Sequence, residues 1–260
     1  MRKDKETKKE NKLKIAIFDL TDCEGCELQI INLKEKLITI LNQAEIVAWR
    51  LVQEKNSSGP FDISLVEGSA QTDEEINLLK NLRERSNYLI ALGSCATIGG
   101  IPSIVGEAKE RKKLFQLIYG PKYKPKAKTS KPIDNYVPVD FYLHGCPVSF
   151  SELERVFTYL LSGRIPEKLP YPVCLECKIK ENECLLIKNK PCLGPITQAG
   201  CQAICITEGK YCYGCQGPTK EANIKALKNR FGQFLKKQET EKYLNLFLKD
   251  TKEYQKWQKK

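Results

Sequence analysis

Cysteine is the residue type in this chain whose number and spacing point to chemistry. The 260 residues include 12 Cys but only one His and one Met. Twelve thiols divide into three sets of four, the number that holds one 4Fe–4S cluster. The N-terminus shows no apolar segment typical of an export signal, so we expect a cytoplasmic protein whose thiols stay reduced. The cysteines are therefore expected to bind metal or iron–sulfur clusters rather than to form six disulfides.

Four of the cysteines follow strands of a predicted parallel sheet. Cys23 and Cys26 form the motif C-E-G-C after the first strand, while Cys95 follows the fourth strand and Cys146 the fifth. The carboxyl ends of parallel strands meet at one edge of a sheet, so we expect the four thiols to converge there. Four thiolates fit a 4Fe–4S cluster; zinc also accepts four cysteines, but structural zinc sites usually use two close pairs. Neighbouring glycines would let the backbone approach such a cluster closely: Gly25, Gly93 and Gly145.

Two further polar residues belong to the same predicted edge. Glu67 follows the third strand, either as a surface carboxylate or as a hydrogen-bonding group close to the cluster. His144, the one histidine, stands two residues before Cys146 and is expected to be packed or to support that ligand. No nucleophile lies beside a base, so we predict no catalytic residue on this chain.

The other eight cysteines lie in one short segment of the chain. Two clusters with four ligands each would use all eight and leave no free thiol. The alternative is a zinc ribbon built from the first and last C-x-x-C pairs, which would leave the four middle cysteines without a role. The eight are Cys174, Cys177, Cys184, Cys192, Cys201, Cys205, Cys212 and Cys215.

The elements that must position these cysteines are predicted from hydrophobic periodicity. Residues 13–165 alternate strand-length apolar runs with helical segments, which predicts an α/β domain with a flavodoxin-like doubly wound parallel sheet. Residues 166–218 predict a small irregular cysteine-rich iron–sulfur domain that bound clusters stabilise. Residues 219–260 predict a charged helical tail that covers either a partner or the chain itself. The predicted strands are Leu13–Leu20, Ala44–Val52, Phe61–Gly68, Asn87–Gly93 and Val137–Gly145, and the helices before the tail are Cys26–Leu41, Thr72–Arg85 and Ser149–Gly163.

Charge and hydropathy exclude two classes of partner. The formal net charge is +11, but much of the positive charge lies at the two ends and in the Lys122–Lys131 loop, away from any aromatic and basic recognition motif. We therefore predict no binding to nucleic acid. No segment approaches the roughly 20 apolar residues that a membrane-spanning helix needs, so we predict no membrane span.

Seven motifs of the chain resemble the small, electron-transferring subunit of NiFe hydrogenases. The resemblance covers residues 13–218 and is nearest to the cytosolic bidirectional type, the delta subunit of sulfhydrogenases. The motifs are D-C-E-G-C-E-L, V-E-G-S, G-S-C-A-T-I-G-G-I-P, H-G-C-P, P-V-C-L-E-C, C-L-G-P-I-T-Q-A-G-C and C-Y-G-C-Q-G-P.

The resemblance implies three 4Fe–4S clusters on this chain and an oxidoreductase whose active site lies elsewhere. It implies a large-subunit partner with a Ni–Fe centre, and further subunits with flavin and iron–sulfur groups that exchange electrons with NAD(P). The proximal cluster would be held by Cys23, Cys26, Cys95 and Cys146, the distal cluster by Cys174, Cys177, Cys184 and Cys192, and the medial cluster by Cys201, Cys205, Cys212 and Cys215. The last eight cysteines can also interleave, so the division between medial and distal rests on the resemblance alone.

The chain departs from some members of this family. Exported members use a His as one distal ligand, where this chain has Cys174, and carry a signal and a membrane anchor. The related quinone-reductase subunit of respiratory complexes lacks the cysteine-rich extension and has adjacent cysteines near its first strand, unlike C-E-G-C here. Two alternatives stay open: the same subunit in a hydrogenase that feeds heterodisulfide reductase or a deazaflavin, and a non-enzymatic metal-bound sensor or scaffold.

Overall fold

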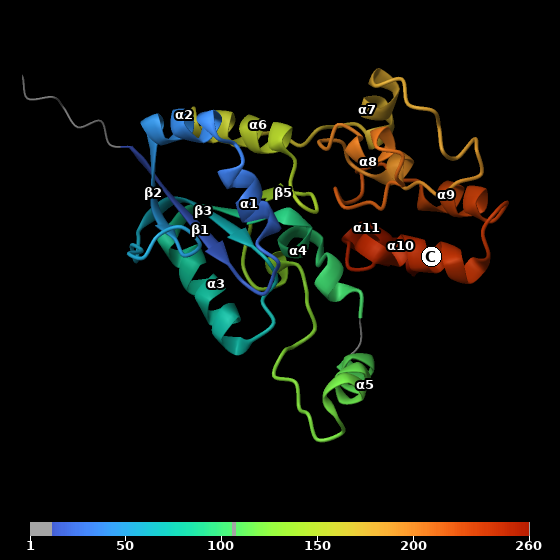
Figure 1. Ribbon diagram of the computed structural model, residues 1–260, viewed down its shortest axis with the longest axis horizontal. Coiled ribbons are helices and arrows are strands. Elements are labelled where there is room, and N and C mark those ends of the chain that lie inside the picture. The colour runs from blue at the N-terminus through green and yellow to red at the C-terminus, as the bar shows by residue number, and fades with distance from the viewer. Residues whose placement is uncertain (1–11, 106–107, 260) are drawn as a thin grey trace, which may run out of the picture.

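A five-stranded parallel sheet forms the centre of the N-terminal part of the chain (Figure 1). The structure is a computed structural model that describes residues 12–105 and 108–259. The strand order is β2-β1-β3-β4-β5, which is the order of a flavodoxin-like doubly wound sheet. This confirms the predicted fold class. The strands are β1 (Leu13–Asp19), β2 (Ala44–Trp49), β3 (Phe61–Glu67), β4 (Ser86–Leu92) and β5 (Phe141–Leu143).

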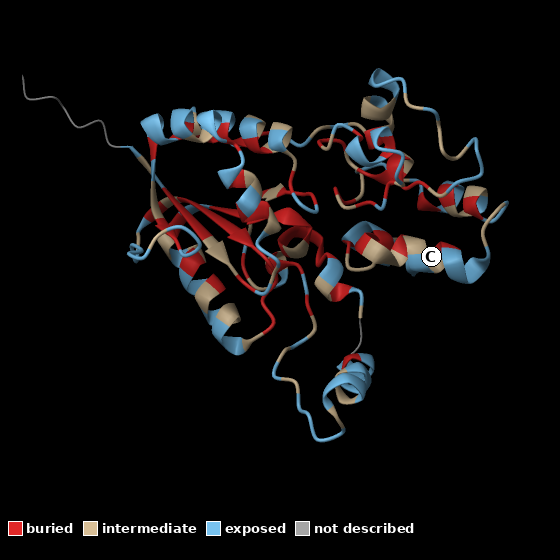
Figure 2. Ribbon diagram, in the orientation of Figure 1, coloured by how far each residue is buried: buried red, intermediate tan, exposed pale blue. Residues whose placement is uncertain are grey.

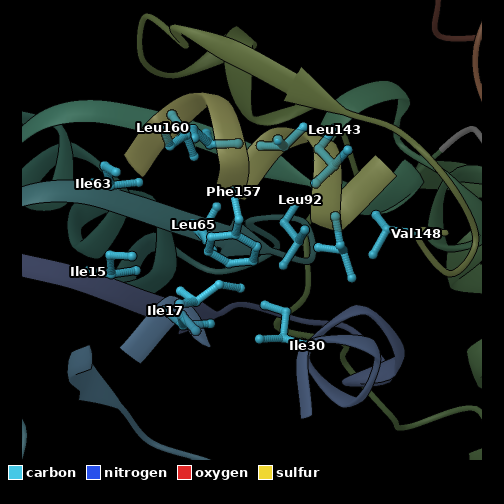
Figure 3. Packing of buried hydrophobic residues seen from close by; sticks show 14 of the residues in the cluster. Ile15, Ile17, Ile30, Ile63, Leu65, Leu92, Leu143, Val148, Phe157 and Leu160 are labelled. Atoms are coloured by element: carbon cyan, nitrogen blue, oxygen red, sulfur yellow. The ribbon is translucent and has the colours of Figure 1, made fainter. Parts of the chain in front are cut away.

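One face of the sheet is covered by α1 (Gly25–Ile31), α2 (Glu35–Gln43) and α6 (Phe150–Leu161). Alternate residues of β1, such as Ile15 and Ile17, point into this layer, where they meet Ile30 of α1 and Phe157 of α6 (Figure 3). Burial of such side chains contributes roughly 1.5–3 kcal/mol each. The layer therefore fixes α1, and with it the residues that follow β1, against the sheet.

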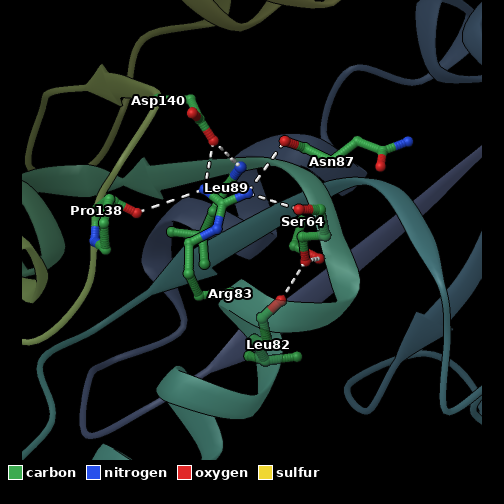
Figure 4. A network of polar contacts seen from close by, with 8 residues as sticks. Ser64, Leu82, Arg83, Asn87, Leu89, Pro138 and Asp140 are labelled. Atoms are coloured by element: carbon green, nitrogen blue, oxygen red, sulfur yellow. Dashed lines mark hydrogen bonds and ion pairs between the residues drawn. The ribbon is translucent and has the colours of Figure 1, made fainter.

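The other face is covered by α3 (Asp73–Arg85) and α4 (Gly93–Ile98). The predicted start of α3 is confirmed, because Thr72 and Glu75 form a reciprocal capping box there. At the other end of α3, the Arg83 guanidinium donates to the carbonyls of Ser86 and Asn87 and pairs with Asp140 (Figure 4). This network joins the end of α3 to the starts of β4 and β5.

The helices differ from the sequence prediction in several places, and α4 was not expected. The helix expected over Cys26–Leu41 is divided into α1 and α2 by a turn at Lys34, whose φ of 52° no right-handed helix adopts. The helix α5 (Ala108–Tyr119) was not expected at all. Of its residues only Arg111 is buried, and the apolar side chains in its second half are left exposed or half-buried.

The cysteine-rich segment and the C-terminal tail share one hydrophobic core. Residues of α7 (Val173–Ile179) and of the following loops pack with α9 (Ile224–Phe231), α10 (Lys237–Leu248) and α11 (Lys252–Gln258). The tail therefore covers this chain itself, one of the two predicted possibilities. The remaining elements are α8 (Ile204–Thr207) and three short 3-10 helices at Ile101–Ser103, Ile133–Asn135 and Gly194–Ile196. No helix of the described residues is long and apolar enough to cross a membrane.

Candidate metal centres

The first cysteine set lies at the carboxyl edge of the sheet. Cys23 and Cys26 follow β1, Cys95 lies in α4 directly after β4, and Cys146 follows β5. The thiols affect one another, since burial, followed by the charges of Cys146 and Cys23, raises the pKa of the Cys95 thiol to about 12. Cys23 and Cys146 are exposed, whereas Cys26 is buried. The set thus stands at the surface with one side open.

Gly93 makes the close approach of Cys26 to β4 possible. Its φ is +82°, and a Cβ atom at this position would lie 2.4 Å from the Cys26 Sγ. An alanine would both strain the backbone and push the sulfur away. Gly145 is equally constrained, because a Cβ there would lie 2.7 Å from the Pro147 carbonyl oxygen. The glycines expected to admit a cluster therefore bring the ligand-bearing loops together.

Glu67 is a buried anchor of the first set rather than a surface carboxylate. It ends β3, which lies between β1 and β4 in the sheet. Its Oε1 accepts a hydrogen bond from the Cys26 backbone N–H at 3.0 Å, and its Oε2 accepts one from Glu27 at 2.8 Å. Burial raises the pKa of Glu67, and these two N–H groups oppose that rise. The carboxylate therefore fixes the first turn of α1, where Cys26 stands.

His144 has a packing role at the same edge. It is buried, and its Nδ1 lies 2.8 Å from the Thr97 Oγ1. The Thr97 hydroxyl donates its proton to the Gly93 carbonyl, so the Nδ1–H of His144 is the donor in this contact. Burial lowers the pKa of His144 to about 3, and the ring is therefore neutral at physiological pH. This arrangement holds α4 against the loop that carries Cys146.

The second set contains the two cysteines of α7 and two from the loop that follows it. Burial, and then the charges of Cys192, Cys177 and Cys184, raise the pKa of Cys174 to about 12. Gly194 lies between two of the sulfurs, because a Cβ there would be 3.3 Å from the Cys192 Sγ and 3.5 Å from the Cys174 Sγ. The structure thus groups these four cysteines. That grouping argues against a zinc ribbon made from the two pairs.

The third set lines a cavity of about 700 Å³ between the start of α6 and the cysteine-rich segment. Apolar side chains such as Val148, Phe150 and Ile204 form much of its wall. Burial, followed by the charge of Cys201, raises the pKa of Cys215 to about 12. The cysteines on the wall are Cys201, Cys205, Cys212 and Cys215, together with Cys146 of the first set.

The third set contacts both of the others. Toward the first set, the Cys146 backbone N–H donates to the Cys215 thiol, and the Ser94 hydroxyl donates to the Cys215 carbonyl at 2.7 Å. Toward the second set, a hydrogen bond from the Cys212 thiol lowers the pKa of Cys192. The three sets therefore follow one another in space in the order first, third, second.

These donors fit iron–sulfur clusters. Buried thiols with raised pKa values ionise only when positive charge lies among them, as the irons of a cluster would. The cavity among the third set gives room for an inorganic core within an apolar wall. No three Cys, His, Asp or Glu side chains among residues 12–105 and 108–259 converge on the point that a single metal ion would need. A 4Fe–4S cube makes a different demand, because it is held from four sides by four thiolates.

Sequence reasoning missed one residue that joins two of the sets. Glu176 lies on α7 between two cysteines of the second set, and its Oε1 accepts from the Gly200 N–H at 2.9 Å. Its Oε2 lies 3.9 Å from the Cys201 Sγ of the third set. Gln202 and Ala203 have positive φ angles, which turn this loop toward the carboxylate. The acidic residue inside C-L-E-C is the signal that was available in the sequence.

Comparison with known proteins shows the family to which this chain belongs. Residues 23–160 match the family of the NADH ubiquinone oxidoreductase 20 kDa subunit. The sulfhydrogenase 2 subunit delta of Pyrococcus furiosus is 38% identical over 237 residues, which cover 90% of this chain and 99% of that protein. A subunit of the F420-non-reducing vhu hydrogenase of Methanocaldococcus jannaschii is 30% identical, over 81% of this chain and 83% of that protein. A chain of an NAD+-reducing [NiFe]-hydrogenase structure superposes with a TM-score of 0.51 at 25% identity, over 60% of this chain and 94% of that one.

Proposed function

This chain belongs to the family of the NADH ubiquinone oxidoreductase 20 kDa subunit and is a small subunit of the NiFe hydrogenase type, and we propose that it conducts electrons between the Ni–Fe site of a large subunit and a flavin-bearing, NAD(P)-reducing partner. Three 4Fe–4S clusters, held by its twelve cysteines, would supply one-electron redox chemistry. The observation that carries the proposal is the contact of the third cysteine set with both of the others.

The contacts between sets support a proximal, medial and distal order. The first set, with exposed Cys23 and Cys146, is the proximal one and faces the large subunit. The third set is medial, because Cys215 meets Cys146 on one side and Cys212 meets Cys192 on the other. The second set is then distal and serves as the exit.

The chain's own residues hold and insulate the ligands. Glu67 and Gly93 fix Cys26, and Glu176 fixes the loop of Cys201. Burial of Cys212 keeps water from its sulfur, and hydrogen bonds reach other sulfurs from the backbone. Burial and hydrogen bonds to sulfur are the means by which a protein sets the potential of a cluster.

Two acceptors for the exit agree with different relatives. The NAD+-reducing [NiFe]-hydrogenase supports a flavin-bearing partner that exchanges electrons with NAD(P). The F420-non-reducing hydrogenase supports an acceptor other than F420. Heterodisulfide reductase is the alternative acceptor that the resemblance leaves open. Identifying the subunits that purify with this chain, in a native complex prepared without oxygen, separates the two.

The proposed order of the clusters is tested with one variant in the distal set and one in the proximal set. Cys177→Ala removes a ligand of the distal set, so we expect loss of NAD(P) reduction by hydrogen. Reduction of small dyes by hydrogen is expected to continue at much of its rate, because small dyes reach the inner clusters. Cys95→Ala removes a ligand of the entry and is the matched variant, for which we expect loss of both activities. Equal loss of both activities in Cys177→Ala, with the complex assembled and its other clusters retained, would show that the second set is not the exit.

A further inference from the structure

The helix α5 exposes an apolar surface that nothing in the described chain covers. Figure 2 shows α5 mostly in the colour of exposed residues. Leu117 is 82% exposed, Ile118 67% and Tyr119 62%. Ile101 and Leu114, also exposed, extend this patch, and we call the five residues the α5 surface. Figure 1 shows α5 standing apart from the sheet and from the other helices. A group of exposed apolar side chains of this kind is typical of a surface that binds a partner.

The α5 surface is preformed by contacts at its base. Arg111, the buried residue of α5, donates to the Gln71 Oε1 at 3.1 Å, and the Lys128 N–H donates to the Gln71 carbonyl at 2.6 Å. The rings of Phe115, Tyr119 and Tyr123 stack with centroids 4.8 to 6.1 Å apart. These contacts hold the helix and the loop after it in one geometry, which lowers the entropy cost of binding.

The shape of the surface fits a protein rather than a lipid bilayer. A cavity of about 370 Å³ lies between α5 and the turn before it. Such a hollow accepts an inserted side chain, as binding hot spots do, whereas a membrane surface fits a continuous apolar face. The apolar residues that line the cavity are Ile101, Pro102, Val105, Leu114, Phe115 and Ile118.

The charge around the surface indicates the chemistry of the partner. Residues 108–131 contain nine Lys or Arg and one Glu, a formal charge of +8 out of +11 for the whole chain. Lys128 pairs with Asp73 in the described chain. A partner that covers α5 therefore needs acidic side chains around an apolar centre.

The position of the surface identifies which partner that is. Gly100 directly precedes Ile101 of the α5 surface, and a Cβ atom at Gly100 would lie 3.1 Å from the Cys95 Sγ. The α5 surface therefore begins, at Ile101, next to the edge where Cys23 and Cys146 are exposed. We propose that the α5 surface is a docking surface for the hydrogenase large subunit, which inserts an apolar side chain within an acidic rim. This inference rests on the function proposed above.

The test is a binding measurement with the cluster-loaded full chain and the large subunit from the native complex. Leu117→Asp/Ile118→Asp places charge on the surface without touching a buried residue. We expect it to weaken binding by about tenfold or more, as loss of an interface hot spot does. Ile179→Asp/Ile187→Asp is the matched control, because these side chains are 73% and 78% exposed in the cysteine-rich segment. We expect the control to bind as the unchanged chain does.

Each outcome decides the proposal. Loss of binding in the α5 variant alone, with its cluster absorption unchanged, supports the docking surface. Unchanged binding of the α5 variant overturns it while the proposed function stands. Binding of the unchanged chain to vesicles of anionic lipid that the α5 variant loses, with large-subunit binding unaffected, assigns the surface to a membrane and also overturns it. If the unchanged chain does not bind the large subunit at all, the proposed function fails and this inference falls with it.

Discussion

Single residues around the first cysteine set decide whether its four thiols can converge. Gly93→Ala places a Cβ 2.4 Å from the Cys26 Sγ and forces a non-glycine residue to a φ of +82°. We expect the variant to lose the proximal cluster, while the other eight cysteines keep the medial and distal clusters. Gly163→Ala is the control, because Gly163 has a similar φ of +72° but no atom within 4 Å of the added Cβ. Backbone strain alone costs about 1–2 kcal/mol, so the control is expected to keep all its iron. Iron analysis and low-temperature electron paramagnetic resonance of both variants check this. Equal cluster loss in the two variants would show that backbone strain, and not the contact with the Cys26 Sγ, removes the cluster.

Glu176 gives a residue-scale prediction about a reduction potential. Its carboxylate lies 3.9 Å from the Cys201 Sγ, and a nearby negative charge disfavours the reduced cluster. Glu176→Gln keeps an acceptor for the Gly200 N–H and removes the charge. We expect the potential of the medial cluster to rise by roughly 50 mV, where 59 mV corresponds to a tenfold change for one electron. A redox titration followed by paramagnetic resonance measures it, and an unchanged potential would show that the carboxylate is only an anchor.

The sequence indicated the ligands at this scale but not the residues that hold them. A cysteine after a predicted strand end has a place in space once the sheet is parallel, so Cys95 and Cys146 could be located from the pattern. The acidic residue inside C-L-E-C marks Glu176, but its contact with Gly200 could not be predicted, because Gly200 is 24 residues away in a loop without periodicity. The burial of Glu67 was equally beyond the pattern, since a carboxylate after a strand is compatible with a surface position.

At the scale of elements, the tail helices complete the core of the cysteine-rich segment. Leu244 of α10 is fully buried there with Leu193 and Phe231. Leu244→Ala is expected to cost about 2–5 kcal/mol, as large-to-small changes in cores do. We expect iron to be lost from the medial and distal sets before the proximal set. Leu117→Ala, at an 82% exposed position, is the control and is expected to change stability by less than about 0.5 kcal/mol. Thermal unfolding and iron release of the two variants test this; early loss of the proximal cluster would argue against a separate core.

The elements themselves followed from the sequence where burial imposes a period. All five strands were predicted, since their apolar runs are buried between two helical layers. The helix α5 was not predicted; it buries only Arg111 and contributes no side chain to either layer of the sheet core. The break at Lys34 was also missed, because apolar spacing continues across it.

At the scale of the molecule, the two ends of the cysteine path present different surfaces. The first set opens at the carboxyl edge of the sheet, and the second set lies in the segment that the tail helices support. The third set lies between them, in contact with Cys146 on one side and Cys192 on the other. A chain that accepts electrons at one partner and delivers them to another needs this separation of entry and exit.

The iron and acid-labile sulfide content of the chain, prepared without oxygen, tests the central claim most directly. Twelve cysteines taken four per cluster predict about twelve iron atoms and about twelve sulfides for each chain, with no zinc. Cys215→Ser, at the contact between the first and third sets, is expected to lose up to about four of each, because one cluster of four irons depends on it. A content of about four iron atoms together with stoichiometric zinc would contradict three clusters in a row.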